Sequence, residues 1–180
     1  NYGQCDVPSE AMDGVIAVSG GYGHSIALKA DGTVAGWGKV PTPAGRFEGP
    51  LADFQVPSGI TNAVAVASGQ GFSLILKGDG TVVVAAGADP ESFRSVWDYF
   101  EEINLPSNLR GVVDIDANIG GSLAILADGS AILWGSGRNS WDGFKTFETS
   151  GPGQIEVETS YIGDEHHRLV PSRGFRLGRM

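Results

Sequence analysis

The chain has little charge, almost no cysteine and no long apolar run, and each shortage excludes a class of protein. Of its 180 residues, 18% are charged, and 12 Lys and Arg stand against 21 Asp and Glu. The resulting net charge of −9 argues against sequence-independent binding of nucleic acid, which needs clustered basic side chains. No apolar run approaches the roughly 18 residues of a membrane span, so we expect no membrane segment.

A single cysteine excludes an internal disulfide framework. We predict that Cys5 is a small buried apolar residue, since no His or Lys close to it in sequence would activate a thiol.

Motifs of catalysis and cofactor binding are also missing from the sequence. No Gly-x-Ser-x-Gly elbow occurs, and neither Gly20-Gly21 nor the Gly-Gln-Gly at 69–71 has the Lys-Ser/Thr of a phosphate loop. The cluster Glu165-His166-His167 contains metal-ligand types, but adjacent histidines in an extended chain point to opposite sides. We therefore expect no cofactor, no metal site and no enzymatic activity.

Glycine is abundant, with 28 residues, and it marks an internal repeat. Asp-Gly occurs at Asp31, Asp79 and Asp128, which are 48 and 49 residues apart, and each pair follows a run that begins with serine. The prolines Pro8 and Pro57, and then Pro106, keep a spacing of 49 residues. Such a fixed period indicates a repeat protein.

Each repeat predicts a small antiparallel sheet. Asp-Gly between two β-prone runs is a strong hairpin signal, because glycine adopts the positive φ of the turn without steric cost. We therefore interpret the three aspartates as turn residues rather than functional acids. In the run 24–28 neither face carries a charge, so both faces are expected to be buried. Short sheets stacked face to face around an axis form a β-propeller, with a solenoid or a stacked sandwich as the rival.

The first repeat also resembles a known family. The string from Val15 to Gly38, VIAVSGGYGHSIALKADGTVAGWG, closely resembles the repeat of the regulator of chromosome condensation family in its bacterial-style form. The resemblance extends over roughly residues 1–135 as three registered copies. It implies an all-β propeller of four-stranded blades, and one propeller fold serves many different partners.

The chain departs from the family pattern in number and in detail. Family propellers commonly have about seven blades, whereas this chain has three repeats and a remnant. Trp-Gly stands at Trp37 and Trp134 but is replaced at Ala85, and the histidine that precedes the repeated serine occurs only at His24. We expect a partial propeller that is a fragment, a partial gene product, or a chain completed by partners or self-association.

The predicted organisation follows the repeats. It consists of the end of a preceding repeat and a linker (1–14), repeat 1 (15–58), repeat 2 (59–107) with a helical insertion (89–103), repeat 3 (108–140) and a divergent tail (141–180).

The insertion predicts one amphipathic helix at about 90–103. Its apolar residues recur at helical spacing, at Phe93, Val96, Trp97, Phe100 and Ile103. The apolar stripe would either dock over the sheet edge that lacks Trp-Gly or form a recognition element. In the second case Trp97, Tyr99 and Phe100 are the candidate partner-binding residues, because aromatic side chains often anchor interfaces.

The tail has lost the repeat register. It contains one alternating stretch at 154–159 and, after Glu165, four arginines without an acidic residue. This basic end is either a solvated terminus or a contact for an acidic partner or phosphate.

Three functions fit these observations. The first is a non-catalytic module that binds another protein, a class that includes a propeller-type enzyme inhibitor. The second, which the family resemblance implies, is a guanine-nucleotide exchange factor for a small GTPase. The third is a propeller-type lyase, which would need acids or histidines that converge on the channel mouth. The sequence shows no repeated set of such residues, so protein binding is the preferred hypothesis.

Overall fold

The fold of the chain is all-β in a computed structural model. The described residues are 2–41, 51–87, 105–107, 109–118 and 121–135, together with the strand residues 147–148, 154–155 and 167–169. The one helical element within them is the 3-10 turn η1 (Ser9–Ala11). In these ranges no helix has the length and apolar character that crossing a membrane requires. The helix predicted at about 90–103 lies outside the described residues.

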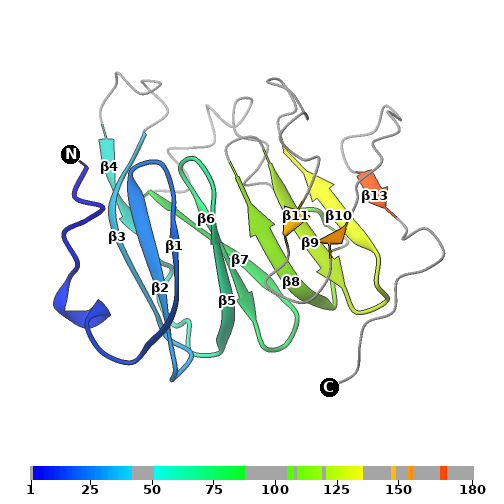
Figure 1. The fold of residues 1–180 in the computed structure, drawn as a ribbon, viewed down its shortest axis with the longest axis horizontal. Helices are drawn as coiled ribbons and strands as arrows, with labels where there is room; N and C mark the ends of the chain where they lie inside the picture. The colour runs from blue at the N-terminus through cyan, green and yellow to red at the C-terminus, as the bar shows by residue number, and fades with distance from the viewer. Residues whose placement is uncertain are drawn as a thin grey trace.

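Three units of three antiparallel strands make up most of the described chain (Figure 1). Unit 1 contains β1 (Val15–Gly20), β2 (His24–Lys29) and β3 (Val34–Pro41), unit 2 contains β5 (Ala63–Ser68), β6 (Ser73–Lys77) and β7 (Val82–Gly87), and unit 3 contains β8 (Val112–Ala117), β9 (Ser122–Leu126) and β10 (Ala131–Trp134). In unit 3 the outer strand β13 (His167–Leu169) pairs with β10, and β11 (Phe147–Glu148) pairs separately with β12 (Gln154–Ile155).

The units share one register, as the spacing of the repeat predicts. The repeated serines mark it: Ser25 pairs with Trp37, Ser73 with Ala85, and Ser122 with Trp134. The first strand of each unit has an irregular step after its first residue, and the residue at that step is exposed in all three units. These exposed residues are Ile16, Val64 and Val113.

Strand β4 (Leu51–Gln55) connects the first two units edge to edge. Its first half pairs with β3 of unit 1, and its last residues, Phe54 and Gln55, pair with the end of β7 in unit 2. Units 1 and 2 therefore form one seven-stranded sheet instead of two separate four-stranded blades.

The core lies between the units, because consecutive units stack face to face. Strand β5 lies against β1 and β2, and β8 lies against β5 and β6. We call the face of a unit that meets the preceding unit its upstream face and the opposite face its downstream face. Ile26 and Leu28 of unit 1 pack on Ile75 of unit 2. In the next interface Leu74 and Leu76 pack on residues of unit 3, including Trp134.

The upstream face of unit 1 has no preceding unit among the described residues, and the N-terminal segment covers part of it. The backbone carbonyl of Gln4 accepts hydrogen bonds from Ser25 Oγ and Trp37 Nε1, both at 2.9 Å, and Ala11 packs on Ala27. The prediction that Cys5 is buried is wrong. The carbonyl of the adjacent Gln4 faces unit 1, whereas the Cys5 thiol is exposed.

Two ends of the stacked units can be distinguished (Figure 1). The Asp-Gly end carries the turns at 31–32, 79–80 and 128–129, between the second and third strands of the units. The corner end carries the connections between the first and second strands, at 21–23 and 69–72, and in unit 3 it carries the facing strand ends Ala117 and Ser122. Because each third strand runs back from the Asp-Gly end, it finishes at the corner end.

Candidate interaction surface and the joint between units 1 and 2

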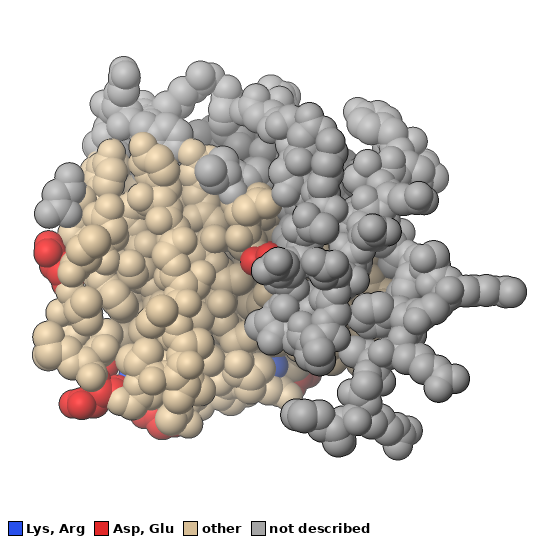
Figure 2. Space-filling view, viewed as in Figure 1, with Lys and Arg blue, Asp and Glu red and all other residues tan. Residues whose placement is uncertain are grey.

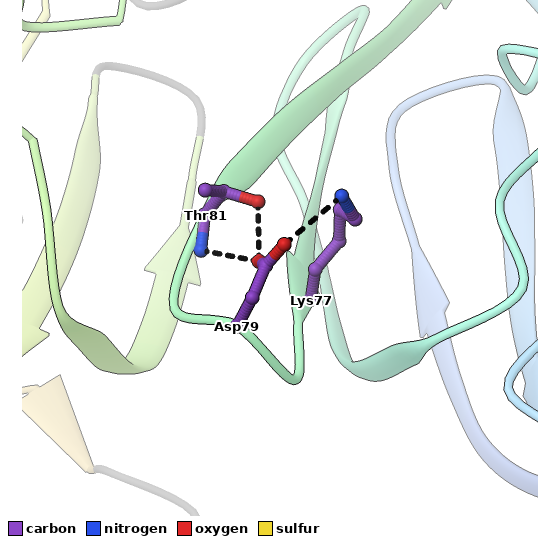
Figure 3. Close-up of polar contacts among 3 residues, drawn as sticks. All are labelled: Lys77, Asp79 and Thr81. Atoms are coloured by element: carbon purple, nitrogen blue, oxygen red, sulfur yellow. Dashed lines mark hydrogen bonds and ion pairs between the residues drawn. The ribbon is translucent and has the colours of Figure 1, made fainter.

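The three Asp-Gly aspartates are structural turn residues, as their sequence context predicts. In unit 2 Asp79 Oδ1 accepts hydrogen bonds from the Thr81 backbone N–H at 3.0 Å and from its hydroxyl at 2.6 Å, and Lys77 Nζ donates to Oδ2 at 3.3 Å (Figure 3). Asp31 and Asp128 make the same pair of contacts with the residue two positions later. Their carboxylates are committed to closing hairpins.

These hydrogen bonds favour the ionised carboxylate. The Thr81 hydroxyl and backbone N–H are the main causes that lower the pKa of Asp79 from 3.8 to about 2. The equivalent contacts with Thr33 lower the pKa of Asp31.

The Asp-Gly end also joins each unit to the next. The N–H of Ala63 donates to the carbonyl of Gly32 at 3.0 Å, and the N–H of Val112 donates to the carbonyl of Gly80 at 3.1 Å. A Cβ at Gly32 would lie 2.5 Å from the Thr61 carbonyl oxygen, and the φ of this residue is +78°, so glycine is required twice over. Acidic side chains gather along the same edge, the lower one in Figure 2. The repeated hydrogen bonds assign this end to the framework.

The corner end is where the units differ. Residues 42–50 connect Pro41 of β3 to Leu51 of β4, and the segments 88–104 and 136–146 start after the third strands of units 2 and 3. All three segments therefore leave the framework at the corner end. Tyr22 lies in the first corner, half exposed, with its ring centroid 6.0 Å from that of Tyr2. The candidate partner-binding residues Trp97, Tyr99 and Phe100 belong to the segment 88–104 and lie outside the described residues.

A polar joint connects units 1 and 2 inside the core. His24 Nε2 lies 2.9 Å from Ser73 Oγ, which in turn lies 2.8 Å from Ser68 Oγ. The His24 ring stacks on Phe54 of β4 at a centroid distance of 4.2 Å and an interplanar angle of 22°. His24 and Ser73 are both fully buried. A side chain of unit 1 thus closes a hydrogen-bonded chain within unit 2.

The His24 ring is held in its neutral form. Burial lowers its pKa from 6.5 to about 4, and the nearby Phe72 backbone, which favours the protonated ring, opposes this effect only in part. Within the described residues Nδ1 has no side-chain or backbone group in hydrogen-bond geometry. From the sequence, His24 stood out because the other repeats have no histidine before the repeated serine, but we assigned it no role. The usable signal was the serine 49 residues later, one repeat away.

Phe54 fills the space left by the missing tryptophan of unit 2. It packs in the same cluster as Ala85, which stands where units 1 and 3 have Trp37 and Trp134. A Cβ at Gly36 would lie 2.5 Å from Phe54 Cε1, so Gly36 provides the room for this ring. The interface between units 1 and 2 is therefore filled from the bridging strand β4.

Two carboxylates on β8 were not singled out from the sequence. Asp114 and Asp116 pair with Ile125 and Leu123, which places them on the downstream face of unit 3. Burial is the main cause that raises the pKa of Asp116, and the charge of Asp114 adds to it. Unit 2 has Ala65 at the position of Asp114. The downstream face of unit 3 is thus more polar than that of unit 2.

The described residues do not gather three or more His, Cys, Asp or Glu side chains into a group that could hold a metal ion. Of the cluster Glu165-His166-His167, only the backbone of His167 lies within the described residues.

Comparison with known proteins identifies the repeat. Residues 15–39 match the Regulator of chromosome condensation (RCC1) repeat, and no curated protein matches the chain. Among solved structures, human WBSCR16 has 21% identity and a TM-score of 0.51, with 77% of this chain covering 42% of that chain.

Two yeast structures have lower TM-scores. Yeast RCC1 (Prp20) bound to Kap60 has 19% identity and a TM-score of 0.47, with 80% of this chain covering 37% of that one. Prp20p from Saccharomyces cerevisiae, whose binding to Gsp1p and histones was characterised with its structure, has 19% identity and a TM-score of 0.49, with coverages of 82% and 39%.

The chain spans about two fifths of the length of these solved structures, between 37% and 42%. Its stacked antiparallel units, repeated in one register, are the architecture of propeller blades. The chain therefore carries a repeat of the regulator of chromosome condensation family, and its described units form part of a β-propeller of that type.

Proposed function

We propose that this chain is a non-catalytic protein-interaction module that binds its partner at the corner end. The carrying observation is the difference between the two ends of the stacked units. The Asp-Gly end repeats the same backbone hydrogen bonds from unit to unit, whereas three segments of unrelated sequence leave the corner end after Pro41, Gly87 and Gly135. Loops on a rigid scaffold are common carriers of binding function.

The composition of these segments supports a protein partner. The segment 88–104 contains Phe93, Trp97, Tyr99 and Phe100, and aromatic residues of this kind dominate the binding energy of many interfaces. We place Trp97, Tyr99 and Phe100 at the interface, on the predicted helix at about 90–103. The net charge of −9 makes nucleic acid an unsuitable partner for such a surface.

The described site supports binding rather than catalysis. The three repeated aspartates are committed to hairpin closure, and His24 is enclosed between units. The module is completed by further propeller units, in the same chain or in another copy, because a propeller buries each blade between two neighbours.

The test compares two variants of the full chain. Trp97→Ala/Tyr99→Ala/Phe100→Ala alters the proposed interface, and Asp13→Ala/Lys29→Ala alters exposed and half-exposed positions near the Asp-Gly end. Proteins retained by each immobilised chain are quantified by mass spectrometry, and direct binding is then measured with the purified candidate. We expect the triple variant to lose the partner at least 10-fold and the control to retain it. Equal retention by both variants would exclude the corner end.

A nucleotide-release assay with purified small GTPases separates simple binding from exchange activity. Accelerated release by the full chain would favour the exchange function over a binding role alone. Unchanged release is the result expected for a non-catalytic module.

A further inference from the structure

The two joints between units differ in chemistry at one repeat position. In the joint of units 1 and 2 this position is His24, which lies against Ser73 of the following unit. In the joint of units 2 and 3 the equivalent position is Phe72, a buried side chain in the cluster that contains Trp134. One joint therefore contains a titratable ring, and the other has an apolar ring of similar size at the same place.

The surroundings of His24 contain no charged group that would stabilise a buried cation. The ring is enclosed by Phe54 of β4, by Ser73 of unit 2, whose hydroxyl also contacts that of Ser68, and by Gly21, where a Cβ would lie 2.1 Å from the ring atom Cε1. None of these neighbours carries a charge. In β3 and β4 the nearest charged residues in sequence are Lys39 and Asp53, which form an exposed ion pair with each other.

A protonated ring would have two N–H donors, but the site offers a partner at only one of them. Ser73 Oγ serves Nε2, whereas Nδ1 faces no group in hydrogen-bond geometry among the described residues. A buried cation with incomplete hydrogen bonding is costly in free energy. The protonated ring is therefore more stable when it is exposed to water than when it is enclosed in the joint.

We propose that the joint between units 1 and 2 is an acid-sensitive hinge, at which protonation of His24 separates unit 1 from unit 2 while units 2 and 3 stay stacked. The exposed form of His24 gains a proton more readily than the buried form. Opening therefore becomes easier as the pH falls.

The direction of the effect follows from proton linkage. The pKa of His24 is lowered from 6.5 to about 4 in the closed joint. The open form binds more protons between these values, so the stability of the joint is complete above pH 6.5 and is lost as the pH falls towards 4. A shift of this size corresponds to an increase in the opening equilibrium on the order of 100-fold.

Hydrogen exchange of the full chain, measured by mass spectrometry between pH 7.5 and 4, tests the hinge. After correction for the intrinsic pH dependence of exchange, the amide of Ala63, which donates to Gly32 across the joint of units 1 and 2, should lose protection by on the order of 100-fold as the pH falls. The amide of Val112, which donates to Gly80 across the joint of units 2 and 3, should keep its protection over the same range. Equal loss at both joints, or no loss at Ala63, would overturn the proposal.

Three variants separate titration from packing. His24→Gln keeps a polar side chain and His24→Phe copies unit 2, and in both the pH dependence of exchange at Ala63 should disappear. Phe72→His should transfer the pH dependence to the joint of units 2 and 3. If His24→Phe fails to fold, His24→Gln still decides the matter. Persistence of the pH dependence in a folded variant without His24 would assign it to another group.

Discussion

The two interfaces between stacked units use the same backbone register but fill their cores differently. In the interface of units 2 and 3 the largest side chain is Trp134, supplied by the third strand of the later unit. In the interface of units 1 and 2 the equivalent residue is Ala85, and the volume comes from Phe54 of the bridging strand β4. The repeated turns and hydrogen bonds fix where the units meet, while the side chain that fills a given interface can come from a different strand.

This comparison explains why the repeat tolerates the loss of Trp-Gly in unit 2. The Phe54 ring fits into the cluster of Ala85 because position 36 is glycine, whereas the equivalent positions of units 2 and 3 are Val84 and Leu133. Small residues at two positions and a large one at a third conserve the total volume, which is the kind of exchange that protein cores accept at low cost.

The largest expected effect is at Trp134. The substitution Trp134→Ala removes a fully buried side chain from the interface of units 2 and 3, and it should lower the free energy of unfolding by about 3–5 kcal/mol. Urea unfolding followed by circular dichroism measures the change. The control Val113→Ala, in the same unit but exposed, should stay within about 0.5 kcal/mol of wild type. A loss below 1 kcal/mol at Trp134 would contradict the core assignment.

The second prediction tests the exchange of volume between Phe54 and Ala85. Phe54→Ala should cost about 3 kcal/mol, and Ala85→Trp alone should cost about 1–3 kcal/mol, because the ring of Phe54 already occupies the space. In the double variant the new tryptophan can enter the cavity, so the combined loss should be smaller than the sum of the single losses. Urea unfolding of the four proteins gives this coupling energy as a double-mutant cycle.

Additive losses in that cycle would show that the two side chains fill different spaces. A matched pair, Leu74→Ala combined with Ala85→Trp, provides the comparison. Leu74 is buried in the other cluster, which contains Trp134, so its loss should add to that of Ala85→Trp without large coupling.

The sequence predicted the periodic part of the fold and missed the exchanges between repeats. Asp-Gly turns and serine-led strands depend on local backbone chemistry, which recurs with the sequence, so the strands and turns could be located from spacing alone. The substitution at Ala85 suggested that an inserted helix either docks over the sheet edge or serves as a recognition element, and this helix lies outside the described residues. The structure packs Phe54 in the same cluster as Ala85, a long-range arrangement that depends on the path of β4 and that no local pattern encodes.

The residues of the candidate site divide in the same way, into those placed by local sequence and those placed by the packing of the units. The assignment of Asp31, Asp79 and Asp128 to turns followed from their neighbours in sequence and is confirmed by their hydrogen bonds. The contact of His24 with Ser73 joins two units, so it required the stacking of the sheets. The partner-binding role of Trp97, Tyr99 and Phe100 stays a prediction.

The third prediction concerns the pH ranges in which the Asp79 turn and the His24 joint lose stability. Its effect is smaller than those of the core substitutions. The pKa of Asp79 is lowered from 3.8 to about 2. Its contribution to stability is therefore present above pH 3.8 and is lost as the pH falls towards 2. The His24 joint loses stability in the higher window, between pH 6.5 and 4. Asp79→Asn should reduce the pH dependence of stability below pH 3.8 and leave the dependence between pH 6.5 and 4 unchanged. Thermal unfolding at several pH values measures both ranges.

Thr81→Ala provides the control for that assignment. It removes the hydroxyl that donates to Asp79 Oδ1, so it should raise the pKa of Asp79 and reduce the same pH dependence in part. If Asp79→Asn changed the window above pH 4 instead, the two ends would not titrate independently.

The smallest expected effect concerns the face that no described unit covers. Val18 of unit 1 is 71% exposed, whereas Ile115, at the same repeat position in unit 3, is 8% exposed because unit 2 lies against it. Val18→Asp should therefore change the free energy of unfolding by no more than about 0.5 kcal/mol, and the exposed Val113→Asp serves as the matched control.

Both are measured by urea unfolding at several protein concentrations, with the mass in solution determined by analytical ultracentrifugation. A loss of several kcal/mol or a fall in mass for Val18→Asp alone would mean that another copy of the chain covers this face. Unit 1 would then be stacked on both sides like unit 2, and the contrast between an open and a covered unit would no longer hold.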